Sequence, residues 1–329
     1  MDITRRDFLK YSGAAGGAAL LGWDGGSAMA SVKSRVAFLR ADDRAAAVAP
    51  VIDALGVNPA KNKHVLIKPN FNTADPCPGS THNDTLKALV EKVWAMGARS
   101  VSIGERSYPP TRQVMEQMGV LPLLSALDVK VLDFDTLEAK DWVKVDAKGS
   151  HWKDGFRVAR PVLEAECLVS TCCLKTHQYG GVFTMALKLH VGVVPTSRHG
   201  FDYMRELHSS PHQRKLIAEI NAPFRTHLVV LDGIDAFVDG GPMDGKRVRG
   251  DVFIASADRV AIDAVGLAVL KHLGSNERVM QTGIFEQEQI ARAVELGIGA
   301  GSPADIDLVP ANAVSRDYRD AVAAILSRG

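Results

Sequence analysis

The chain alternates short apolar runs with longer amphipathic segments. Apolar runs of about four to eight residues predict buried strands, and apolar residues recurring every three or four positions predict helices. In the first half, strand-like runs cover residues 35–40, 64–71, 100–105 and 129–134, and helix-like segments cover 44–56, 83–98 and 111–119. This alternation predicts a mostly parallel sheet with helices on both faces.

The second half repeats the alternation after a more polar middle. Residues 141–146 and 155–161 are typical of short antiparallel strands. Further strands are expected at 167–175, 227–234, 251–257 and 305–310, and helices at 183–190, 211–222, 258–274 and 285–297. We therefore expect an α/β fold, either as two α/β lobes (31–150 and 151–329) with a cleft between them or as one continuous domain. The boundary near residue 150 is soft because no linker marks it.

The first 30 residues have the composition of an export signal. "TRRDFLK" at residues 4–10 precedes an apolar, Ala/Gly-rich run from Ala14 to Leu21, and Ala28-Met29-Ala30 has the small residues of a cleavage site. This order predicts a twin-arginine signal peptide at 1–30 and a mature chain from about Ser31. The alternative, an Arg-rich amphipathic helix, leaves the cleavage site unexplained. The apolar run is shorter than the ~20 residues of a membrane span.

These features predict where the protein goes and which partners it meets. We expect the twin-arginine machinery to export it to the periplasm or beyond, with no membrane span after cleavage. Lys and Arg number 39 against 38 Asp and Glu, for a net charge of +1, and the signal segment is itself neutral. A basic surface for nucleic acid is therefore not expected. The apolar share of 46% is ordinary for a globular protein.

Polar residues follow four predicted strands at the point where each strand becomes a loop. By strand period, Lys68 and Asn70 point to the same side of their strand, and so do Lys175 and His177 of theirs. Ligands of open parallel sheets bind at the carboxyl ends of strands, so we expect these side chains to meet in a cleft. The residues are Lys68 and Asn70, Glu105, Lys175 and His177, and Asp232.

The segment after the strand at 167–175 is rich in cationic side chains. Gly180-Gly181 allows a turn, and Lys188 lies on the helix expected next. Together with Lys68 and backbone N–H groups, Lys175 and Lys188 could bind a carboxylate or a phosphate. The spacing does not match a Walker loop. The alternative is a solvated loop with surface lysines and a histidine at the rim of the core.

Histidines are frequent between His177 and His212. His177 and His199 are candidate proton-transfer groups, because imidazole titrates near neutral pH, and Asp232 is a third candidate catalytic group. No HExxH or paired-Cys spacing indicates a metal site. A metal site would have to be assembled from scattered residues such as His177, His199 and Asp232.

Two residues further along the chain complete the candidate ligand site. Asp263 falls inside an apolar helical stretch, and an unpaired buried carboxylate is costly, so we expect it to meet a cation such as one of the lysines. Gly241 precedes Pro242 in an Asp- and Gly-rich stretch and would bring the backbone close to a ligand. That stretch lacks the spacing of a calcium loop and otherwise predicts a tight turn or a long hairpin.

The four cysteines do not have the closely spaced pairs of an iron–sulfur site, so no such cluster is expected. Cys167, Cys172 and Cys173 lie in a predicted core strand and are interpreted as small buried hydrophobes. The oxidising destination nevertheless permits disulfides.

Taken together, the motifs resemble the domain-of-unknown-function 362 family. "VLIKPNF", "THND", "LKTH", "ALKLHVGVVP", "RHG", "VVLDGIDAFVDGGPMDG" and "IASADRVAIDAVG" occur in the family's order between Val65 and Pro310. The resemblance implies the fold and the location of the site rather than a reaction. The family usually has Lys-Asn where this chain has Lys188-Leu189, and many relatives carry a ferredoxin-like cluster segment that is missing here. The positions carried over are Lys68-Pro69-Asn70, Thr81-His82, Lys175-Thr176-His177, Lys188, Gly192, His199, Asp232-Gly233, Gly241-Pro242, Ser256, Asp258 and Asp263.

Three functional hypotheses follow. The leading one is an exported enzyme acting on a small anionic molecule, with the three lysines holding the anion and His177 or His199 transferring protons. The second is a non-catalytic binding or carrier protein for an anionic cofactor or a metal. The third is a redox or maturation accessory protein that uses Cys172 and Cys173. The cofactor, if there is one, is not identified by the sequence.

Overall fold

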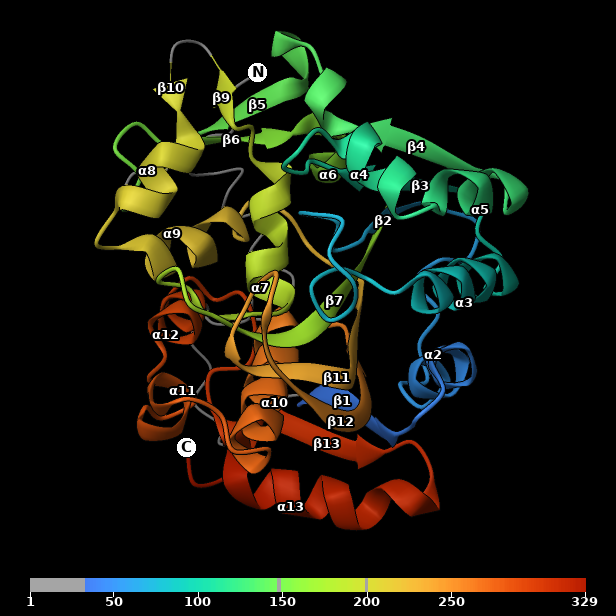
Figure 1. The fold of residues 1–329 in the computed structure, drawn as a ribbon, viewed down its shortest axis with the longest axis vertical. Helices are drawn as coiled ribbons and strands as arrows, with labels where there is room; N and C mark the ends of the chain where they lie inside the picture. The colour runs from blue at the N-terminus through green and yellow to red at the C-terminus, as the bar shows by residue number, and fades with distance from the viewer. Residues whose placement is uncertain (1–32, 147–148, 199–200) are drawn as a thin grey trace, which may run out of the picture.

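One nine-stranded sheet runs through the part of the chain that the structure describes, in the order β13-β1-β12-β11-β7-β2-β3-β4, with β8 paired to β7 (Figure 1). This computed structural model describes residues 33–146, 149–198 and 201–329. The predicted signal peptide, its cleavage site and His199 lie outside these ranges. The strands are β1 (Ser34–Arg40), β2 (His64–Lys68), β3 (Ser100–Glu105), β4 (Val129–Asp133), β7 (Cys167–His177), β8 (Val182–Thr184), β11 (Leu228–Gly240), β12 (Gly245–Ser256) and β13 (Ile306–Pro310).

Most neighbouring strands in the sheet are parallel. β4, β3, β2, β7 and β11 pair in parallel, as do β1 and β13. β12 folds back on β11 and runs antiparallel to both β11 and β1. The predicted α/β class is confirmed, and the Asp- and Gly-rich stretch forms the turn of the long β11–β12 hairpin. Because β2 pairs with β7, strands from both sides of residue 150 share one sheet.

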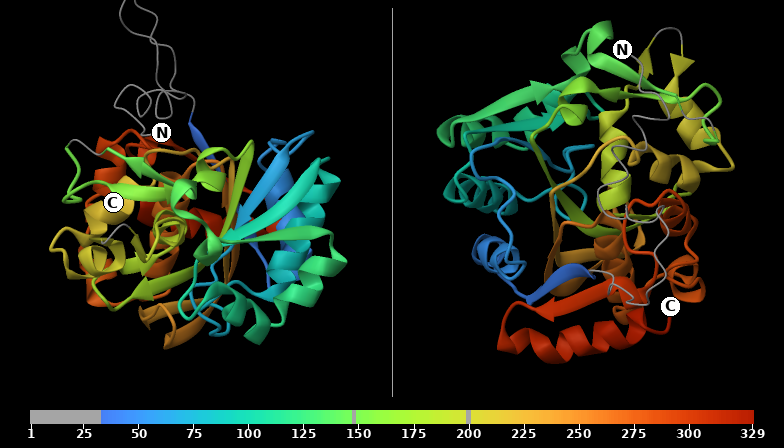
Figure 2. Two further views of the ribbon diagram at one scale, coloured as in Figure 1. Left: turned by 90° about the horizontal axis from the view of Figure 1, so that it is seen from above. Right: turned by 180° about the vertical axis from the view of Figure 1, so that it is seen from behind.

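Helices cover both faces of the sheet, and each face has its own apolar core (Figures 1 and 2). On one face lie α2 (Arg44–Asp53), α3 (Asn83–Ala95), α4 (Thr111–Gln117) and α5 (Val120–Ala126). On the other lie α7 (Ala186–Leu189), α10 (Arg259–His272), α11 (Glu277–Gln281), α12 (Glu288–Glu295) and α13 (Arg316–Leu326). Strand period explains the division, since Val65 and Ile67 of β2 face the first core while Leu66 between them faces away.

A third core lies over Leu66 and Leu168, beyond the end of α7. It is formed by the antiparallel strands β5 (Trp142–Val145) and β6 (Phe156–Ala159) and by the helices α6 (Arg160–Leu163), α8 (Tyr203–Ser209) and α9 (Gln213–Ile220). The short strands β9 (Ser197–Arg198) and β10 (Phe201–Asp202) precede α8. The pair of short strands predicted around residue 150 is confirmed.

The predicted helix at 183–190 is only partly correct. Residues Val182–Thr184 are extended and pair antiparallel with Lys175–His177 of β7. The turn at Gly180-Gly181 folds the chain straight back on itself, so β8 takes up residues whose apolar pattern also suits a helix. The helix itself is the four-residue α7, which continues into a 3-10 turn at His190–Val193. Among the described helices, α5, α6, α8, α11 and α13 were not predicted.

Candidate functional site

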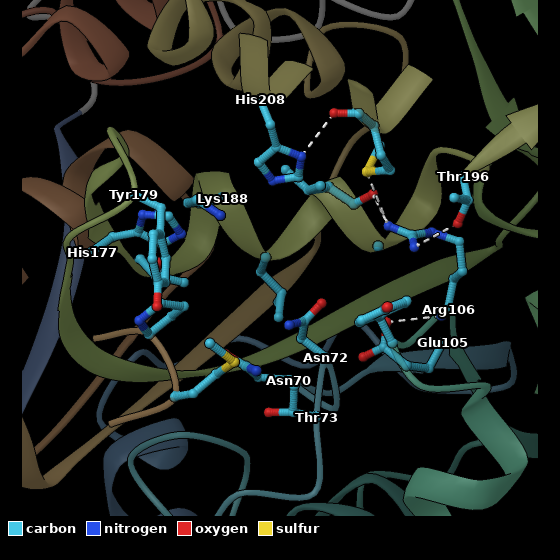
Figure 3. Close-up of a pocket in the computed structure, with 18 of the residues that line it drawn as sticks. Asn70, Asn72, Thr73, Glu105, Arg106, His177, Tyr179, Lys188, Thr196 and His208 are labelled. Carbon is cyan, nitrogen blue, oxygen red and sulfur yellow. Dashed lines mark hydrogen bonds between the residues drawn. The ribbon is translucent and has the colours of Figure 1, made fainter. Parts of the chain in front are cut away.

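A pocket of about 550 Å³ opens at the carboxyl ends of β2, β3 and β7 (Figure 3). The predicted residues that line it are Lys68, Asn70, Glu105, Lys175, His177 and Lys188, together with Gly192 and Pro242 from the family motifs. Among the described lining residues, five side chains are cationic and two are carboxylates, so the pocket has an excess of positive charge. The cationic residues are Lys68, Arg106, Lys175, Lys188 and Arg205, and the carboxylates are Glu105 and Asp202.

Lys68 and Glu105 form a buried ion pair on the pocket wall, with Nζ 2.5 Å from Oε1. Glu105 also accepts the backbone N–H groups of Phe71 and Arg106, each at 2.9 Å. Burial lowers the pKa of Lys68 and raises that of Glu105, and the pairing opposes both shifts. Gly192 packs against the pair so closely that a Cβ there would lie 2.5 Å from Glu105 Oε1. This end of the pocket is therefore fixed in position and already balanced in charge.

Lys175 lies at the end of β7 and is 1% exposed. Its ammonium donates a hydrogen bond to the carbonyl oxygen of Gly79 at 2.5 Å. Burial lowers its pKa. Lys175 therefore has a polar partner but, in the described part of the chain, no carboxylate at hydrogen-bond distance, and it ties the loop between β2 and α3 to the sheet.

Lys188 is the least satisfied cation of the pocket. It projects from α7, and within the described ranges its ammonium has neither a hydrogen-bond nor an ion-pair partner. Burial, together with the charges of Lys175 and Arg106, lowers its pKa to about 8. Figure 3 shows its amine beside His177, across the pocket from Glu105 and Arg106. An unpaired, partly buried ammonium is costly, so a bound anion would stabilise it.

His177 is neutral at physiological pH in this arrangement. Burial, and then the charges of Lys188 and Lys175, lower its pKa to about 2. Nδ1 accepts the N–H of Gly181 at 3.3 Å, which leaves the ring proton on Nε2. The ring meets Tyr179 edge-on, with centroids 5.9 Å apart. His177 can therefore donate or accept a hydrogen bond, whereas its burial and the neighbouring positive charges oppose uptake of a second ring proton.

Three buried polar atoms of the lining have no hydrogen-bond partner in the described part of the chain. They are Asn70 Oδ1, Thr73 Oγ1 and Thr184 Oγ1. Buried polar atoms are normally hydrogen-bonded, so such orphans in a pocket indicate groups that a ligand or water satisfies. The backbone N–H of Asn70 is already bonded to Thr81 Oγ1 at 2.9 Å, which holds the side chain in place.

Asp232 does not lie in the pocket, and the expectation that it joins Lys175 there is corrected. Its side chain points to the face covered by α2 and α3, where it accepts hydrogen bonds from Arg44 Nε at 2.9 Å and Thr85 Oγ1 at 2.7 Å. Asp232 lies within β11 rather than at its end, and it is the strand partner of Cys173 on β7, so both side chains take the face covered by α2 and α3.

The proposed metal ligands are therefore separated. His177 lines the pocket, whereas the Asp232 side chain lies on the face of the sheet that α2 and α3 cover. His199 lies outside the described ranges. Within those ranges, no group of three or more His, Cys, Asp or Glu side chains is placed to hold a metal ion.

Asp263 meets backbone N–H groups instead of the expected lysine. It is fully buried on α10, and its two oxygens accept the N–H groups of Ala186 at 2.7 Å and Leu187 at 3.1 Å. Burial raises its pKa to about 7, and the two hydrogen bonds oppose the shift. Asp263 therefore caps the first turn of α7 and positions Lys188 from outside the pocket.

Gly241 does not line the pocket itself but shapes the turn beside it. Its φ is +69°, and a Cβ there would lie 2.1 Å from the carbonyl oxygen of Thr176. Glycine is required for this close approach of the β11–β12 turn to β7. The next two residues, Pro242 and Met243, line the pocket in its place.

Several lining residues were not among the predicted site residues. Arg106 directly follows Glu105 at the end of β3, so the strand-end pattern could have included it. Its buried guanidinium donates to Val194 O at 2.7 Å and Thr196 Oγ1 at 3.1 Å. Tyr108 and Tyr179 lie at the rim and are 78% and 56% exposed. No sequence pattern indicates these tyrosines.

Cys172 and Cys173 point to opposite faces of β7. Cys172 packs in the core beneath α10, and Cys173 contacts the carbonyl oxygen of Ser80 on the other face, at 3.4 Å. The predicted burial of Cys167, Cys172 and Cys173 is confirmed. The hypothesis of a redox or maturation accessory protein needs Cys172 and Cys173 to act together. Their placement on opposite faces of β7 does not favour it.

Similarity to known proteins covers most of the chain. Residues 65–268 match the family described as "Domain of unknown function (DUF362)", and residues 2–22 match the twin-arginine translocation signal. A thylakoid-associated protein from Synechocystis sp. is 26% identical over 216 residues, which is 63% of this chain and 63% of that protein's length. The chain therefore spans less than two thirds of that relative.

One solved structure is similar over most of its length. The lactate racemase apoprotein from Thermoanaerobacterium thermosaccharolyticum aligns over 87% of this chain and 85% of its own, with a TM-score of 0.42 and 13% identity. A similarity of this size does not bear on the reaction. The twin-arginine signal directs the protein across the membrane to the periplasm or beyond, and none of the described helices has the length and apolarity to span a membrane. Because the family match covers more than half of the chain, the protein belongs to the family described as domain of unknown function (DUF362), as an exported member.

Proposed function

We propose that this exported protein is an enzyme that acts on a small anionic molecule bound in the pocket through a carboxylate or phosphate group. The observation that carries the proposal is Lys188, an ammonium without a partner among the described residues, in a pocket with excess positive charge. A bound anion would offset the cost of keeping Lys188 protonated. Lys175 lies close enough to lower the pKa of Lys188, so one anion would interact with both.

The ligand would also carry hydroxyl or other donor groups. Asn70 Oδ1 is an acceptor only, and the hydroxyls of Thr73 and Thr184 either donate or accept. All three lack partners among the described residues. A ligand that satisfies them would be favoured over an equally charged one without polar groups, because leaving buried polar atoms unpaired costs about 1–3 kcal/mol each. Hydroxylated carboxylates and sugar phosphates have this combination.

Proton transfer in the pocket would depend on the bound anion. Without an anion, the pKa of Lys188 is about 8, while that of His177 is about 2. Burial is the largest cause of the low pKa of His177, and a negative charge between Lys175 and Lys188 would offset the next ones, the charges of these two lysines. His177 would then act as the proton-transfer group, with Lys68 and Glu105 fixing the opposite wall. His199 stays a second candidate by sequence.

A binding or carrier protein without turnover is the second candidate function. The low pKa of His177 favours it, because a general base works best with a pKa near the working pH. Incubating the protein with each bound anion and analysing the solution for products separates the two functions.

The binding test uses the mature chain and a panel of anions, measured by isothermal titration calorimetry. The panel contains inorganic phosphate, acetate, 2-hydroxy carboxylates and sugar phosphates, with an uncharged sugar as the negative control. We expect at least one anion to bind, and Lys188→Met to weaken its binding by tenfold or more. Lys140→Met is the matched control, because Lys140 is an exposed lysine paired with Glu138 and does not line the pocket. Unchanged binding in the Lys188→Met variant, or no binding of any anion, would overturn the proposal.

A further inference from the structure

Cys77 and Cys173 meet beneath the pocket, although 96 positions separate them in the sequence. Cys77 belongs to the loop between β2 and α3, and Cys173 to the middle of β7. Cys77 Sγ lies 3.9 Å from Asp232 Oδ2, and Asp232 is the strand partner of Cys173 across β11 and β7. Partner residues on adjacent strands point to the same face, so both thiols lie on the side covered by α2 and α3.

The two thiols lie in one cluster on this face of the sheet. Cys77 Sγ lies 3.9 Å from Asp232 Oδ2, and Cys173 Sγ donates to Ser80 O, three residues after Cys77 in the same loop, at 3.4 Å. Both cysteines are nearly inaccessible, at 6% and 1% exposure. Neither is part of the pocket lining, so this pair is separate from the anion site.

The loop that carries Cys77 supplies part of the pocket. Asn70, Thr73 and Gly79 all line it. Two contacts from β7 hold the loop, namely Lys175 to Gly79 O and Cys173 to Ser80 O. The second is a weak thiol contact, whereas a covalent bond at the same place would hold the loop firmly.

We propose that Cys77 and Cys173 form a disulfide after export, and that this bond fixes the loop between β2 and α3 against β7. In the reaction, each thiol loses its proton and the pair gives up two electrons. The oxidant is a disulfide, either of an oxidoreductase or of oxidised glutathione. It accepts the electrons and leaves as two thiols, through a mixed disulfide with one of the cysteines.

The timing follows from the export route and the burial. Twin-arginine cargo folds in the reducing cytoplasm, so the two thiols come together before any oxidant is present. The neighbouring Cys173 and burial raise the pKa of Cys77, which keeps the reactive thiolate scarce. Oxidation should therefore be slow in the closed protein and should require a transient opening of the loop.

The test counts free thiols in the protein taken from two compartments. Exported protein and the Arg5→Lys/Arg6→Lys variant, which stays in the cytoplasm, are denatured in iodoacetamide, digested and mapped by mass spectrometry. The signal segment contains no cysteine, so both samples carry the same four. We expect alkylation of only Cys167 and Cys172 in the exported protein, with a peptide linking Cys77 to Cys173, and alkylation of all four in the retained variant.

Two variants and a second measurement make the assignment specific. The exported Cys172→Ser variant should keep the link, and Cys173→Ser should leave Cys77 free for alkylation. Amide hydrogen exchange in residues 71–82 should be at least about tenfold slower in the linked protein than in the same protein after reduction. The proposal is overturned by four alkylated cysteines in the exported protein, by a link between any other pair, or by a link already present in the retained variant.

Discussion

The three lysines of the pocket differ in what balances their charge. Lys68 is paired with Glu105, Lys175 is hydrogen-bonded to a backbone carbonyl, and Lys188 has no partner in the described chain. A bound anion changes the environment of an unbalanced charge more than that of a neutralised one. Lys188 is therefore the residue whose substitution best separates ligand binding from folding. Lys175 separates them less well, because its removal also releases the loop at Gly79.

Lys188→Met should stabilise the protein in the absence of ligand. The substitution removes a partly buried ammonium that lacks a counter-ion and keeps most of the apolar stem. The free energy of unfolding should rise by roughly 1–3 kcal/mol, measured by urea denaturation at pH 7. Lys140→Met, at an exposed position, should change it by less than about 0.5 kcal/mol. A clear loss of stability in Lys188→Met would mean that the amine has a stabilising partner.

Anion binding should weaken as the pH rises past about 8. The anion binds the protonated Lys188, whose pKa in the free protein is about 8, so each further pH unit removes protonated amine about tenfold. The measurement is the dissociation constant of a bound carboxylate between pH 6 and 9.5, because carboxylates do not titrate in that range. In Lys188→Met the binding should be weak and should lose this pH dependence. A flat profile in the unmodified protein would show that Lys188 does not contact the anion.

At the scale of elements, α7 depends on a residue from another helix. A helix of four residues cannot satisfy its own N-terminal N–H groups. Asp263 of α10 accepts two of them, at Ala186 and Leu187. The position of Lys188 in the pocket therefore depends on a carboxylate that is 75 residues further along the chain and that does not touch the pocket.

Asp263→Asn should loosen α7. Asparagine has one acceptor oxygen where aspartate has two, so one buried N–H of α7 loses its partner, at a cost of about 1–3 kcal/mol. Hydrogen exchange at Ala186 and Leu187 should accelerate, and anion affinity should fall with it. Asp307→Asn, at an exposed position on β13, is the matched control. Unchanged exchange at both amides would contradict the capping role.

The same residue predicts a pH dependence of stability. The pKa of Asp263 is about 7 in the folded protein and 3.8 for an ordinary aspartate, so folding takes up a proton between these values. Its contribution to stability is therefore greatest below about pH 4 and is lost as the pH rises towards 7. Urea denaturation at pH 4.5 and 7 should show this loss in the unmodified protein. The loss should be absent from the Asp263→Asn variant, and an equal loss in both proteins would assign it to other groups.

The apolar pattern predicted an element correctly where the local sequence determines its structure. It failed where pairing with another segment of the chain determines the structure. The strand at 35–40 matches β1, whose middle residues 36–39 are apolar and buried, and the strand at 100–105 matches β3, in which buried Val101 and Ile103 alternate with serines. The segment at 183–190 has a helical apolar pattern, yet its first residues pair with β7 through the turn at Gly180-Gly181. Pairing of this kind depends on which strand is nearby in space, which a local pattern does not contain.

For the whole molecule, the sequence predicted which edge of the sheet carries polar residues but not which face each one takes. Lys68, Lys175 and Lys188 reach one pocket, and their roles there stay predictions. Asp232 was expected to end a strand at the same edge, yet it lies within β11 (Leu228–Gly240) and its side chain turns away from the pocket to meet Arg44, which is 188 positions earlier. The choice depends on α2 packing beneath β11, a tertiary contact. Ion pairs between distant segments follow from the complete fold rather than from spacing in the chain.

The last prediction concerns export of the whole chain. β1 begins at Ser34 and pairs on both sides, with β12 and β13, so the start of the mature domain is an inner strand of the sheet. Cleavage near Ser31 would leave this strand complete and remove only residues that precede it. Arg5→Lys/Arg6→Lys should therefore abolish export while the retained protein folds normally. Cell fractionation followed by intact mass measurement checks both points, with the exported mass expected to correspond to a start near Ser31. Export of the variant at the normal level would show that the paired arginines are not required, and a start beyond Ser34 would require β1 to be dispensable.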